Sequence, residues 1–531
     1  MSRILEINVV RKNWLKVPFK MAIVYPNVYR VGMTSLAVHI VYSLANMRND
    51  VLCERAFLPY TEPLIVNSLE SHQSLKNFDL VAFSLQYETD YINMLRILRS
   101  SGIPLKSEER GENDPIIAAG GPCVWENPEP IAEFVDVFAI GDAEILLDDL
   151  LNACTYYHKE DALRELSEME GFYVPKFSSG VIRRRIATNL DDYPYPVAQI
   201  IPQVEEDSKF CPIFGKSFLL EVSRGCVRGC RFCLIGFQNR PFRTRSLGRI
   251  RELIEVGIDA TGVRNVVLIG AAVFDHRNFK DICWEVVNRG YGLSVPSLRV
   301  DSFDEDIALA LSEGGQRTVT FAPEAGTYRL REFINKPFTE EQILQACSVA
   351  RVCGIKNVKL YFMVGLPSET MDDIVEIAKL VEKVKKLGFP PDAVRVSVTP
   401  FIPKPHTPFQ WMPQMPLREL RRRIERLRRE LSLVGIRNFE FVDPRWAKIQ
   451  AALSLGDRRL GKLLELIATR DVDWRSGQKI TGIDLSEYTD RPRDPDSPLP
   501  WDHIDVGIPK TLLLREFERA CEFLKESSPE K

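Results

Sequence analysis

The chain has 531 residues, of which 45% are hydrophobic and 27% charged, and its formal net charge is −3. This length suffices for about two to four domains, and so small a charge gives no global attraction to nucleic acid or to an acidic membrane surface. The 11 cysteines are an odd number and mostly stand singly, which argues against a secreted disulfide scaffold. No apolar run approaches the roughly 20 residues that span a bilayer, so we expect a cytoplasmic protein without a membrane partner.

From Lys20 the sequence alternates short apolar runs with amphipathic stretches. Apolar runs typical of buried parallel strands occupy residues 21–25, 51–57, 80–84, 116–119 and 135–140. Helical periodicity fills the gaps, for instance at 35–47 and 91–99. This alternation predicts a Rossmann-like open α/β sheet over residues 1–150, in which ligands bind at the carboxyl ends of the strands.

Small and polar residues gather where these predicted strands end. They are Asn27, Tyr29 and Gly32, then Ser84, then Gly120 and Gly121, and finally Gly141, Asp142 and Glu144. Glycine at a strand-to-helix turn lets a ligand approach the backbone closely. We therefore expect these residues to line a binding site. The pattern weakens over residues 151–210, where short strands and a Pro-bearing stretch predict a connector.

The most informative stretch is Cys226-Val-Arg-Gly-Cys230-Arg-Phe-Cys233, which follows the apolar segment 217–222. Three thiolates on one loop can turn towards one centre, and soft sulfur ligands select zinc, copper(I) or an iron–sulfur cluster. Structural zinc needs four closed ligands, and a fully ligated four-iron cluster needs four thiolates. Because only three cysteines are clustered, we expect a four-iron cluster with one open iron. A zinc site completed by Cys211 is the alternative.

This motif resembles that of the radical S-adenosylmethionine (SAM) superfamily, which places an aromatic residue, here Phe232, just before the last cysteine. The resemblance implies a [4Fe–4S] cluster on Cys226, Cys230 and Cys233, with SAM bound at the open iron and cleaved to a 5′-deoxyadenosyl radical. It also implies an electron donor such as ferredoxin or flavodoxin. The βα alternation over residues 211–415 is then a partial (β/α)6 radical SAM barrel.

The strand ends of residues 1–150 look like the cobalamin-binding domain that precedes many radical SAM cores, in which the double glycine Gly120-Gly121 recurs. The family's Asp-x-His-x-x-Gly motif, whose His coordinates cobalt, aligns here with residues 27–32, so the lower cobalt ligand is absent. Two interpretations stay open. The domain binds cobalamin without that ligand, or it kept the fold and no longer binds a corrin.

Further strand ends in the predicted barrel correspond to positions that the superfamily uses for SAM. Gly270 and Ala271 stand in place of a Gly-Gly-Glu turn that binds the methionyl amino group. Arg299, in a predicted strand at 295–302, suits a carboxylate, and Glu324, in one at 318–326, suits vicinal hydroxyls. Gly365 resembles the superfamily's glycine that leaves room for the adenine base of SAM. We expect the neighbouring Glu369 to cap the helix at 372–386.

The last predicted barrel strand, 393–400, runs into a Pro-rich exit that contains His406, for which a structural role is expected. Apolar residues three and four apart in the Arg-dense segment 417–431 predict a helix with one buried stripe and a solvated arginine face. Binding of RNA or another phosphorylated substrate is the alternative. Residues 416–531 are expected to be mainly helical, with a loop around Trp501 that forms either a lid or a core cap.

Together these features predict a SAM-dependent radical enzyme that transfers a methyl or methylthio group to an unactivated carbon. Two alternatives remain: a radical SAM enzyme of other chemistry without cobalamin, and a non-enzymatic iron–sulfur or zinc protein that senses redox state or binds nucleic acid. The sequence indicates neither the substrate, whether RNA, protein or small molecule, nor the residue that assists hydrogen transfer.

Overall fold

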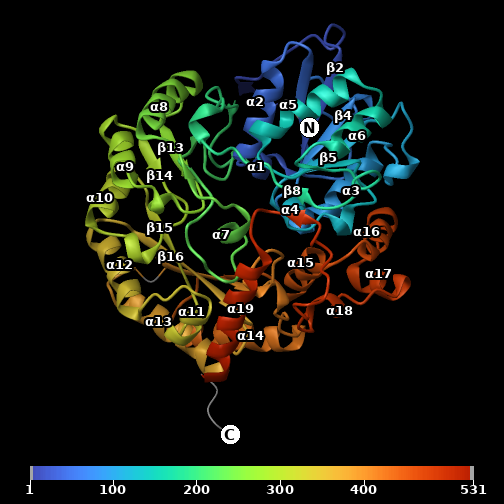
Figure 1. Ribbon diagram of the computed structural model, residues 1–531. Helices are drawn as coiled ribbons and strands as arrows, with labels where there is room; N and C mark the ends of the chain where they lie inside the picture. The colour runs from blue at the N-terminus through green and yellow to red at the C-terminus, as the bar shows by residue number, and fades with distance from the viewer. Residues whose placement is uncertain (1–3, 391, 527–531) are drawn as a thin grey trace.

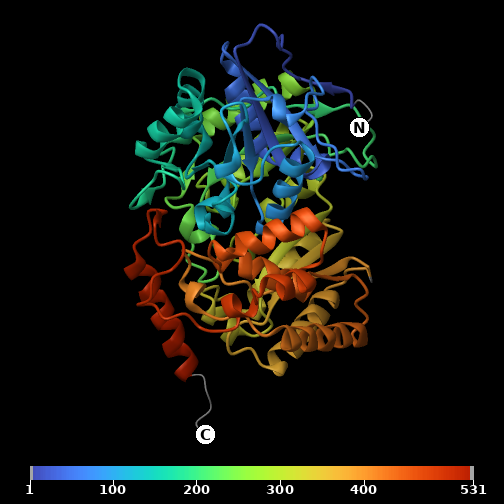
Figure 2. The same cartoon turned by 90° about the vertical axis from the view of Figure 1, so that its right-hand side faces the viewer.

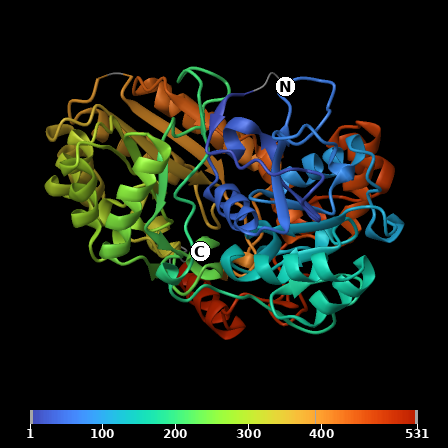
Figure 3. The same cartoon turned by 90° about the horizontal axis from the view of Figure 1, so that it is seen from above.

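The computed structural model describes residues 4–390 and 392–526. An N-terminal α/β unit and a barrel lie side by side, and C-terminal helices pack below the N-terminal unit (Figure 1). Seen from above, the two α/β units meet along one long boundary (Figure 3). The predicted combination of a Rossmann-like sheet, a partial barrel and a helical C-terminal region is confirmed.

The N-terminal unit is built on a six-stranded sheet in the order β3-β2-β4-β5-β6-β7, in which β7 alone pairs antiparallel. Its strands are β2 (Phe19–Val28), β3 (Val51–Leu58), β4 (Leu80–Ser84), β5 (Ile116–Gly120), β6 (Val137–Ala139) and β7 (Phe172–Tyr173). Its helices are α1 (Tyr29–Gly32), α2 (Leu36–Met47), α3 (Tyr91–Ser100), α4 (Pro122–Glu126), α5 (Ala143–Tyr156) and α6 (Lys159–Glu168).

Both faces of this sheet are buried, which explains why its strands read as continuous apolar runs. Met21 and Ile23 of β2 face the core that contains α2, α5 and α6. Ala22 and Val24, pointing the other way, join the core that contains α3. The connector that follows is tied down by short pairings, β9 (Ile201–Pro202) with β1 (Glu6–Ile7) and β8 (Ile182–Arg183) with β19 (Ile504–Asp505).

The barrel is an open, parallel half-cylinder. Its strands are β10 (Phe218–Glu221), β13 (Asn265–Ile269) and β14 (Gly292–Ser294) in one sheet, and β15 (Thr318–Glu324), β16 (Asn357–Val364), β17 (Val394–Pro400) and β18 (Phe439–Phe441) in the other. The outer helices are α8 (Leu247–Thr261), α9 (Phe279–Asn288), α10 (Glu305–Glu313), α12 (Glu340–Val352), α13 (Met371–Lys385) and α14 (Leu417–Leu433). Their inner faces and the strands form one continuous core.

The predicted strand at 295–302 is wrong. The structure has a single bridge there, Leu298 to Phe321, which joins the two barrel sheets, followed by a 3-10 helix at Val300–Ser302. Pro296 has no N–H to donate to a ladder, so the regular strand β14 ends before it. The predicted stripe of α14 is confirmed, because Leu420, Ile424 and Leu427 are buried.

The C-terminal region consists of α15 (Pro444–Leu455), α16 (Arg459–Arg470), α17 (Trp474–Thr481), α18 (Ser486–Thr489) and α19 (Lys510–Glu526). Leucines of α16 join the α3 face of the N-terminal sheet, and Figure 2 shows these helices beneath that unit. Helix α19 instead packs along the barrel exit. Within residues 4–390 and 392–526, no helix combines the length and apolarity needed to cross a membrane.

Candidate cofactor site

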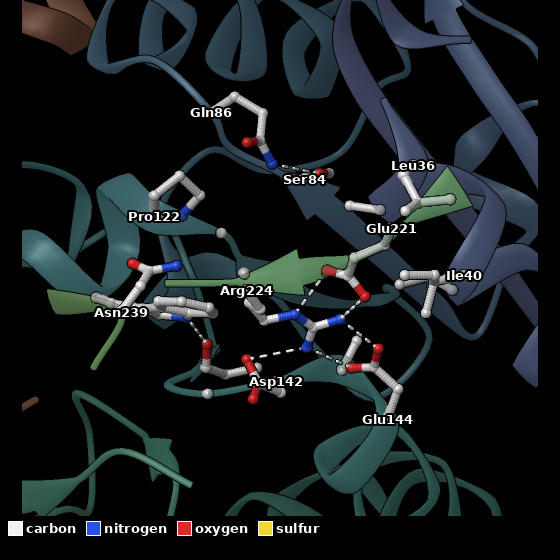
Figure 4. A pocket seen from close by; sticks show the side chains of 18 of the residues that line it. Leu36, Ile40, Ser84, Gln86, Pro122, Asp142, Glu144, Glu221, Arg224 and Asn239 are labelled. Atoms are coloured by element: carbon white, nitrogen blue, oxygen red, sulfur yellow. Dashed lines mark hydrogen bonds and ion pairs between the residues drawn. The ribbon is translucent and has the colours of Figure 1, made fainter. Parts of the chain in front are cut away.

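A cavity of about 510 Å³ lies between the carboxyl edge of the N-terminal sheet and the barrel (Figure 4). Ser84, Gly120 and Gly121 line it from the sheet, and Gly270 and Ala271 line it from the end of β13. The structure thus brings together five residues that the sequence assigns to two different cofactors. Parallel strands of both units end at this cavity, as ligand sites in such folds require.

The deep part of the cavity is an apolar slot between the sheet and two helices. Met21, Ile23 and Ala82 line it from the sheet, with Leu36 and Ile40 from α2 and further leucines from α5. In the sequence these residues are indistinguishable from ordinary core positions. Only the packing of α2 and α5 shows that they border a cavity.

Two of the lining glycines allow the backbone to pass closely. Gly121, the N-cap residue just before α4, has φ +117°, and a Cβ added there would lie 2.4 Å from the carbonyl oxygen of Leu85. A Cβ on Gly270 would lie 2.5 Å from the Ser223 hydroxyl oxygen. The loops on both sides of the cavity therefore need glycine at these two positions.

An ion-pair network joins the two units at the cavity wall (Figure 4). Arg224 Nη2 lies 2.7 Å from Glu144 Oε1, Nε lies 2.9 Å from Glu221 Oε1, and Nη1 lies 3.2 Å from Asp142 Oδ1. Burial would raise the pKa of Glu221, but the guanidiniums of Arg224 and Arg245 hold that pKa below its usual value. Asp142 and Glu144 follow the strand-end Gly141 and belong to the strand-end residues that the sequence predicts at a binding site, whereas Glu221 and Arg224 carry no such signal in the sequence.

The three cysteines lie on the loop between β11 (Ser223–Arg224) and α7 (Ile235–Gln238). Burial is the main cause that raises the pKa of each of the three thiols. The pKa of Cys233 rises to about 12, and the neighbouring Cys230 and Cys226 contribute to that rise. The thiols therefore sense one another's charge. Binding of a metal centre must displace their protons, which makes metal affinity depend on pH.

The spacing of these sulfur atoms differs from that of a single-ion site. Among the residues that the structure describes, one trio of His, Cys, Asp or Glu ligand atoms lies within 4.8 Å of one another, namely Glu88, Cys123 and Glu126. Both carboxylates of that trio pair with Lys404. The sulfur atoms of Cys226, Cys230 and Cys233 do not all lie within 4.8 Å of one another. Thiolate sulfurs around one tetrahedral zinc would lie about 3.8 Å apart, at a Zn–S distance of about 2.3 Å.

Arg299 and Glu324 lie close enough to the cysteine loop to affect it. The Arg299 guanidinium lowers the pKa of Cys230 and the Glu324 carboxylate raises it, both less strongly than burial does. Each charge already has a partner, because Arg299 Nη2 lies 2.8 Å from Asp301 Oδ2 and Glu324 Oε1 accepts from Lys336 at 2.9 Å. Neither residue lines the cavity.

Gly365 directly follows β16 with φ +82°, and its N–H donates to Glu369 Oε1 at 2.8 Å. The expected helix-capping role of Glu369 is wrong. Thr370 caps α13 in a capping box with Asp373, while Glu369 folds back to Gly365 and to Arg423 Nε at 3.0 Å. Burial raises the pKa of Glu369 to about 8.

The remaining predicted cofactor residues do not line the cavity. The Tyr29 hydroxyl donates to Glu6 at 2.6 Å, and a Cβ on Gly32 would lie 2.2 Å from the ring of Phe57. The Asn27 amide donates to Asp90 at 3.3 Å, in a different cleft. Phe232 packs in an apolar cluster with α19.

The two loops whose roles were left open are packed inside the protein. Trp501 is 1% exposed and donates its indole N–H to Gln410 at 2.9 Å, as a core cap would. His406 is also buried, and its backbone N–H donates to the same Gln410 side chain. Its placement agrees with the structural role expected for it.

Comparison with known proteins agrees with this architecture. Residues 37–175 match the family described as radical SAM proteins, N-terminal, and residues 220–381 match the radical SAM superfamily. An uncharacterized protein of Methanocaldococcus jannaschii is 36% identical over 451 residues, covering 85% of this chain and 92% of that protein. An uncharacterized methyltransferase of Pyrococcus horikoshii is 26% identical over 279 residues, covering 50% of this chain and 58% of that protein.

Among solved structures, the radical SAM methyltransferase TsrM from Kitasatospora setae, with cobalamin and a [4Fe–4S] cluster bound, has the same fold. Its TM-score is 0.52 at 14% identity, covering 88% of this chain and 99% of that one. At this identity the likeness concerns the fold alone. The cysteine motif, the half-barrel, the family matches and the archaeal relative agree, and the chain belongs to the radical SAM superfamily.

Proposed function

We propose that this protein is a radical SAM methyltransferase that carries a [4Fe–4S] cluster on Cys226, Cys230 and Cys233 and cobalamin in the cavity between its two α/β units. The observation that carries the proposal is the cavity itself. It joins the strand-end glycines of the N-terminal sheet to Gly270 and Ala271 of the barrel. A reaction that uses two cofactors needs such a shared space.

The cysteine loop fits a cluster better than a single ion. Cys226 and Cys230 raise the pKa of Cys233, so the thiols lie near one another, yet their three sulfur atoms are not gathered as closely as around one zinc. When bound, the reduced cluster would supply one electron to the sulfonium of SAM, and an acidic electron-transfer protein such as ferredoxin or flavodoxin is the proposed donor. Cys211, the fourth ligand of the zinc alternative, is buried, and burial raises its pKa. The charges that act on its thiol come from Arg30, Glu206 and Lys216 rather than from the cysteine loop.

The proposed SAM contacts are residues at the barrel strand ends and Arg299, which follows the single bridge at Leu298. The backbone at Gly270 and Ala271 borders the cavity and offers carbonyl groups to an amino group. Arg299, 18% exposed in its side chain, presents a planar fork for a carboxylate, with Glu324 nearby for hydroxyls. Gly365 leaves room at the end of β16 for a flat base. In this proposal the carboxylate of SAM replaces Asp301 as the ion-pair partner of the Arg299 guanidinium.

The lining of the cavity also suits part of a cobalamin. The apolar slot between the sheet and α2 and α5 suits the nucleotide tail, and the glycines at 120 and 121 allow close approach. Tyr29, at the position of the family's cobalt ligand, is fully buried and bonded to Glu6, so the protein would leave the lower face of cobalt without a side-chain ligand. Bound methylcobalamin would supply the methyl group.

The protein's own residues would close this site against water. Arg224 holds Glu144 of the N-terminal unit and Glu221 of the barrel at the cavity wall. The surrounding side chains are largely apolar, which excludes water from a reactive radical. We retain the division into residues 1–150, 151–210, 211–415 and 416–531 as a proposal.

Cofactor retention tests the proposal. The chain is reconstituted anaerobically with iron, sulfide and hydroxocobalamin and then desalted, and we expect about four irons and about one corrin per chain. Cys226→Ala should lose the cluster, whereas Cys353→Ala, on a partly buried cysteine after α12, should keep it. A zinc-bound chain without iron would overturn the proposed cluster.

A cavity-filling variant tests the corrin site separately. Gly120 has an ordinary φ, and a Cβ there meets nothing closer than 3.8 Å, so Gly120→Val puts its methyl groups into the cavity without backbone strain. We expect this variant to keep the iron and lose the corrin. Gly111→Val, on an open loop, is the matched control. A wild-type chain that keeps its cluster but retains no corrin would favour methylthio transfer or other radical chemistry.

A further inference from the structure

A second cleft, of about 760 Å³, lies between the N-terminal unit and the C-terminal helices. Asn27, Asp90 and Arg96 line it from the side of α3, and Asp443, Trp446 and Trp474 line it from the side of α15 and α17. It shares no lining residue with the cofactor cavity. The proposed function therefore assigns it no role.

Asp90 is the unusual residue of this cleft. It is 3% exposed, and its Oδ1 accepts from the amides of Asn27 and Asn93, both at 3.3 Å. Its Oδ2 is buried and has no hydrogen-bond partner among the described residues. Buried carboxylate oxygens are normally paired, so the structure lacks a donor at this point.

The charge of the cleft favours a cation. Four aspartates, Asp90, Asp443, Asp471 and Asp473, line it with the guanidinium of Arg96, and Asp443 is paired with Arg445 at 2.6 Å outside the lining. Arg96 Nη2 is already 3.3 Å from Asp471. A phosphate or carboxylate ligand would meet a net negative wall, while a cation would be attracted to it.

Aromatic surface lies beside these carboxylates. Trp446 is 50% exposed although it is a large hydrophobic residue, and Trp474 packs with its side chain partly buried on the neighbouring core. The face of an indole attracts organic cations through its quadrupole, and a nearby carboxylate adds a charge-assisted hydrogen bond. A hydrated metal ion would not use the indole.

We propose that this cleft is a binding site for an organic cation, a guanidinium or primary ammonium group that donates to Asp90 Oδ2 and lies against Trp446. The group can belong to a small amine or to a basic side chain of a peptide. This inference does not rest on the proposed methyl transfer, because no cluster or corrin residue takes part.

Binding is measured by calorimetry and tryptophan fluorescence on the full chain, with agmatine as the small amine and N-acetyl-arginine amide as the peptide side chain. We expect saturable binding of at least one, and none of inorganic phosphate at equal ionic strength. Equal affinity for both probes identifies the charged group alone as the ligand, and binding of the arginine amide alone identifies a peptide. Failure of both cations to bind, or preferential binding of phosphate, overturns the proposal.

Two variants locate the site. Asp90→Asn should weaken binding by about tenfold or more, because it removes the charge and keeps the shape. Trp446→Ala should weaken it by about twofold to fivefold, while Trp446→Phe keeps most of the affinity. Asp207→Asn, on an exposed loop, is the matched control and should bind like the wild type. Unchanged affinity in both Asp90→Asn and Trp446→Ala would contradict the assignment.

The same titrations on the Cys226→Ala chain separate this site from the proposed function. We expect cation binding to survive loss of the cluster. Loss of cation binding in that variant, with its fold intact by circular dichroism, would show that the cleft depends on the cofactor site and would overturn its independence.

Discussion

Replacing Arg224 by methionine should destabilise the junction of the two α/β units more than any surface substitution. Arg224 contacts three carboxylates, Asp142, Glu144 and Glu221, whose side chains are 1%, 5% and 8% exposed. Removing one partner of a buried ion pair leaves uncompensated charge and costs about 3–5 kcal/mol. Asp142 still pairs with Arg243, and Glu221 with Arg245. Within residues 4–390 and 392–526, Glu144 is therefore the carboxylate of the three that loses its ion-pair partner.

The pH dependence of this loss follows from the pKa values. Burial raises the pKa of Asp142 and Glu221, but their arginine partners outweigh it and hold both below the ordinary values. Such depressed values stabilise the fold above the unfolded-state pKa of about 4, and this stabilisation disappears as the pH falls through the folded-state values. The difference between wild type and Arg224→Met should therefore be largest near neutral pH and shrink below about pH 5.

Urea unfolding of the cofactor-free chain at pH 7.5 and pH 5 measures this difference, with Arg428→Met on the exposed face of α14 as the control. Glu144→Gln should recover part of the loss when combined with Arg224→Met, because it removes the unpaired charge. A loss below about 1 kcal/mol, or one that does not change with pH, would refute the account of a buried network that ties the units together.

Three further predictions concern single buried residues. Burial raises the pKa of Glu369 to about 8, so between about pH 4.5 and pH 8 this carboxyl ionises only in the unfolded chain and the stability of the wild type should fall. Glu369→Gln should flatten this pH dependence of the unfolding free energy in urea titrations. An unchanged slope would contradict the assignment. Gly365→Ala should cost about 1–3 kcal/mol, because Gly365 has φ +82° and the added Cβ would lie 2.4 Å from Leu420 Cδ2; Gly111→Ala is its control, and equal unfolding midpoints would count against the strain. Lys404→Met should cost about 3–5 kcal/mol, because it leaves Glu88 and Glu126, each 1% exposed, without their ammonium; a smaller loss than for the exposed Lys386→Met would refute that pairing.

The sequence predicts most of the fold because both sheets are parallel and buried on two faces. Consecutive apolar residues, as in 80–84 and 116–119, are typical of strands that are buried on both faces. The failure at 295–302 has a local cause. Its apolar residues read as a strand, yet Pro296 removes a ladder donor and the chain makes only one bridge.

The candidate site was predictable only in part. The closely spaced cysteines 226–233 and the glycines at strand ends can be recognised in the sequence. The structure places five of the predicted residues at one cavity, namely Ser84, Gly120, Gly121, Gly270 and Ala271. The sequence also predicts that the loop at 27–32 lines this site. In the structure Tyr29 packs away from the cavity, and its hydroxyl donates to Glu6. Arg224 and the apolar slot depend on contacts between distant segments, which no local pattern encodes.

Cleavage of SAM tests the central claim most directly. The reconstituted chain is incubated anaerobically with dithionite and SAM, and 5′-deoxyadenosine is measured. The account predicts this product from the wild type and from Cys353→Ala, and none from Cys226→Ala, Cys230→Ala or Cys233→Ala. A chain with its full iron content that leaves SAM intact, or a product that survives loss of these cysteines, would contradict it.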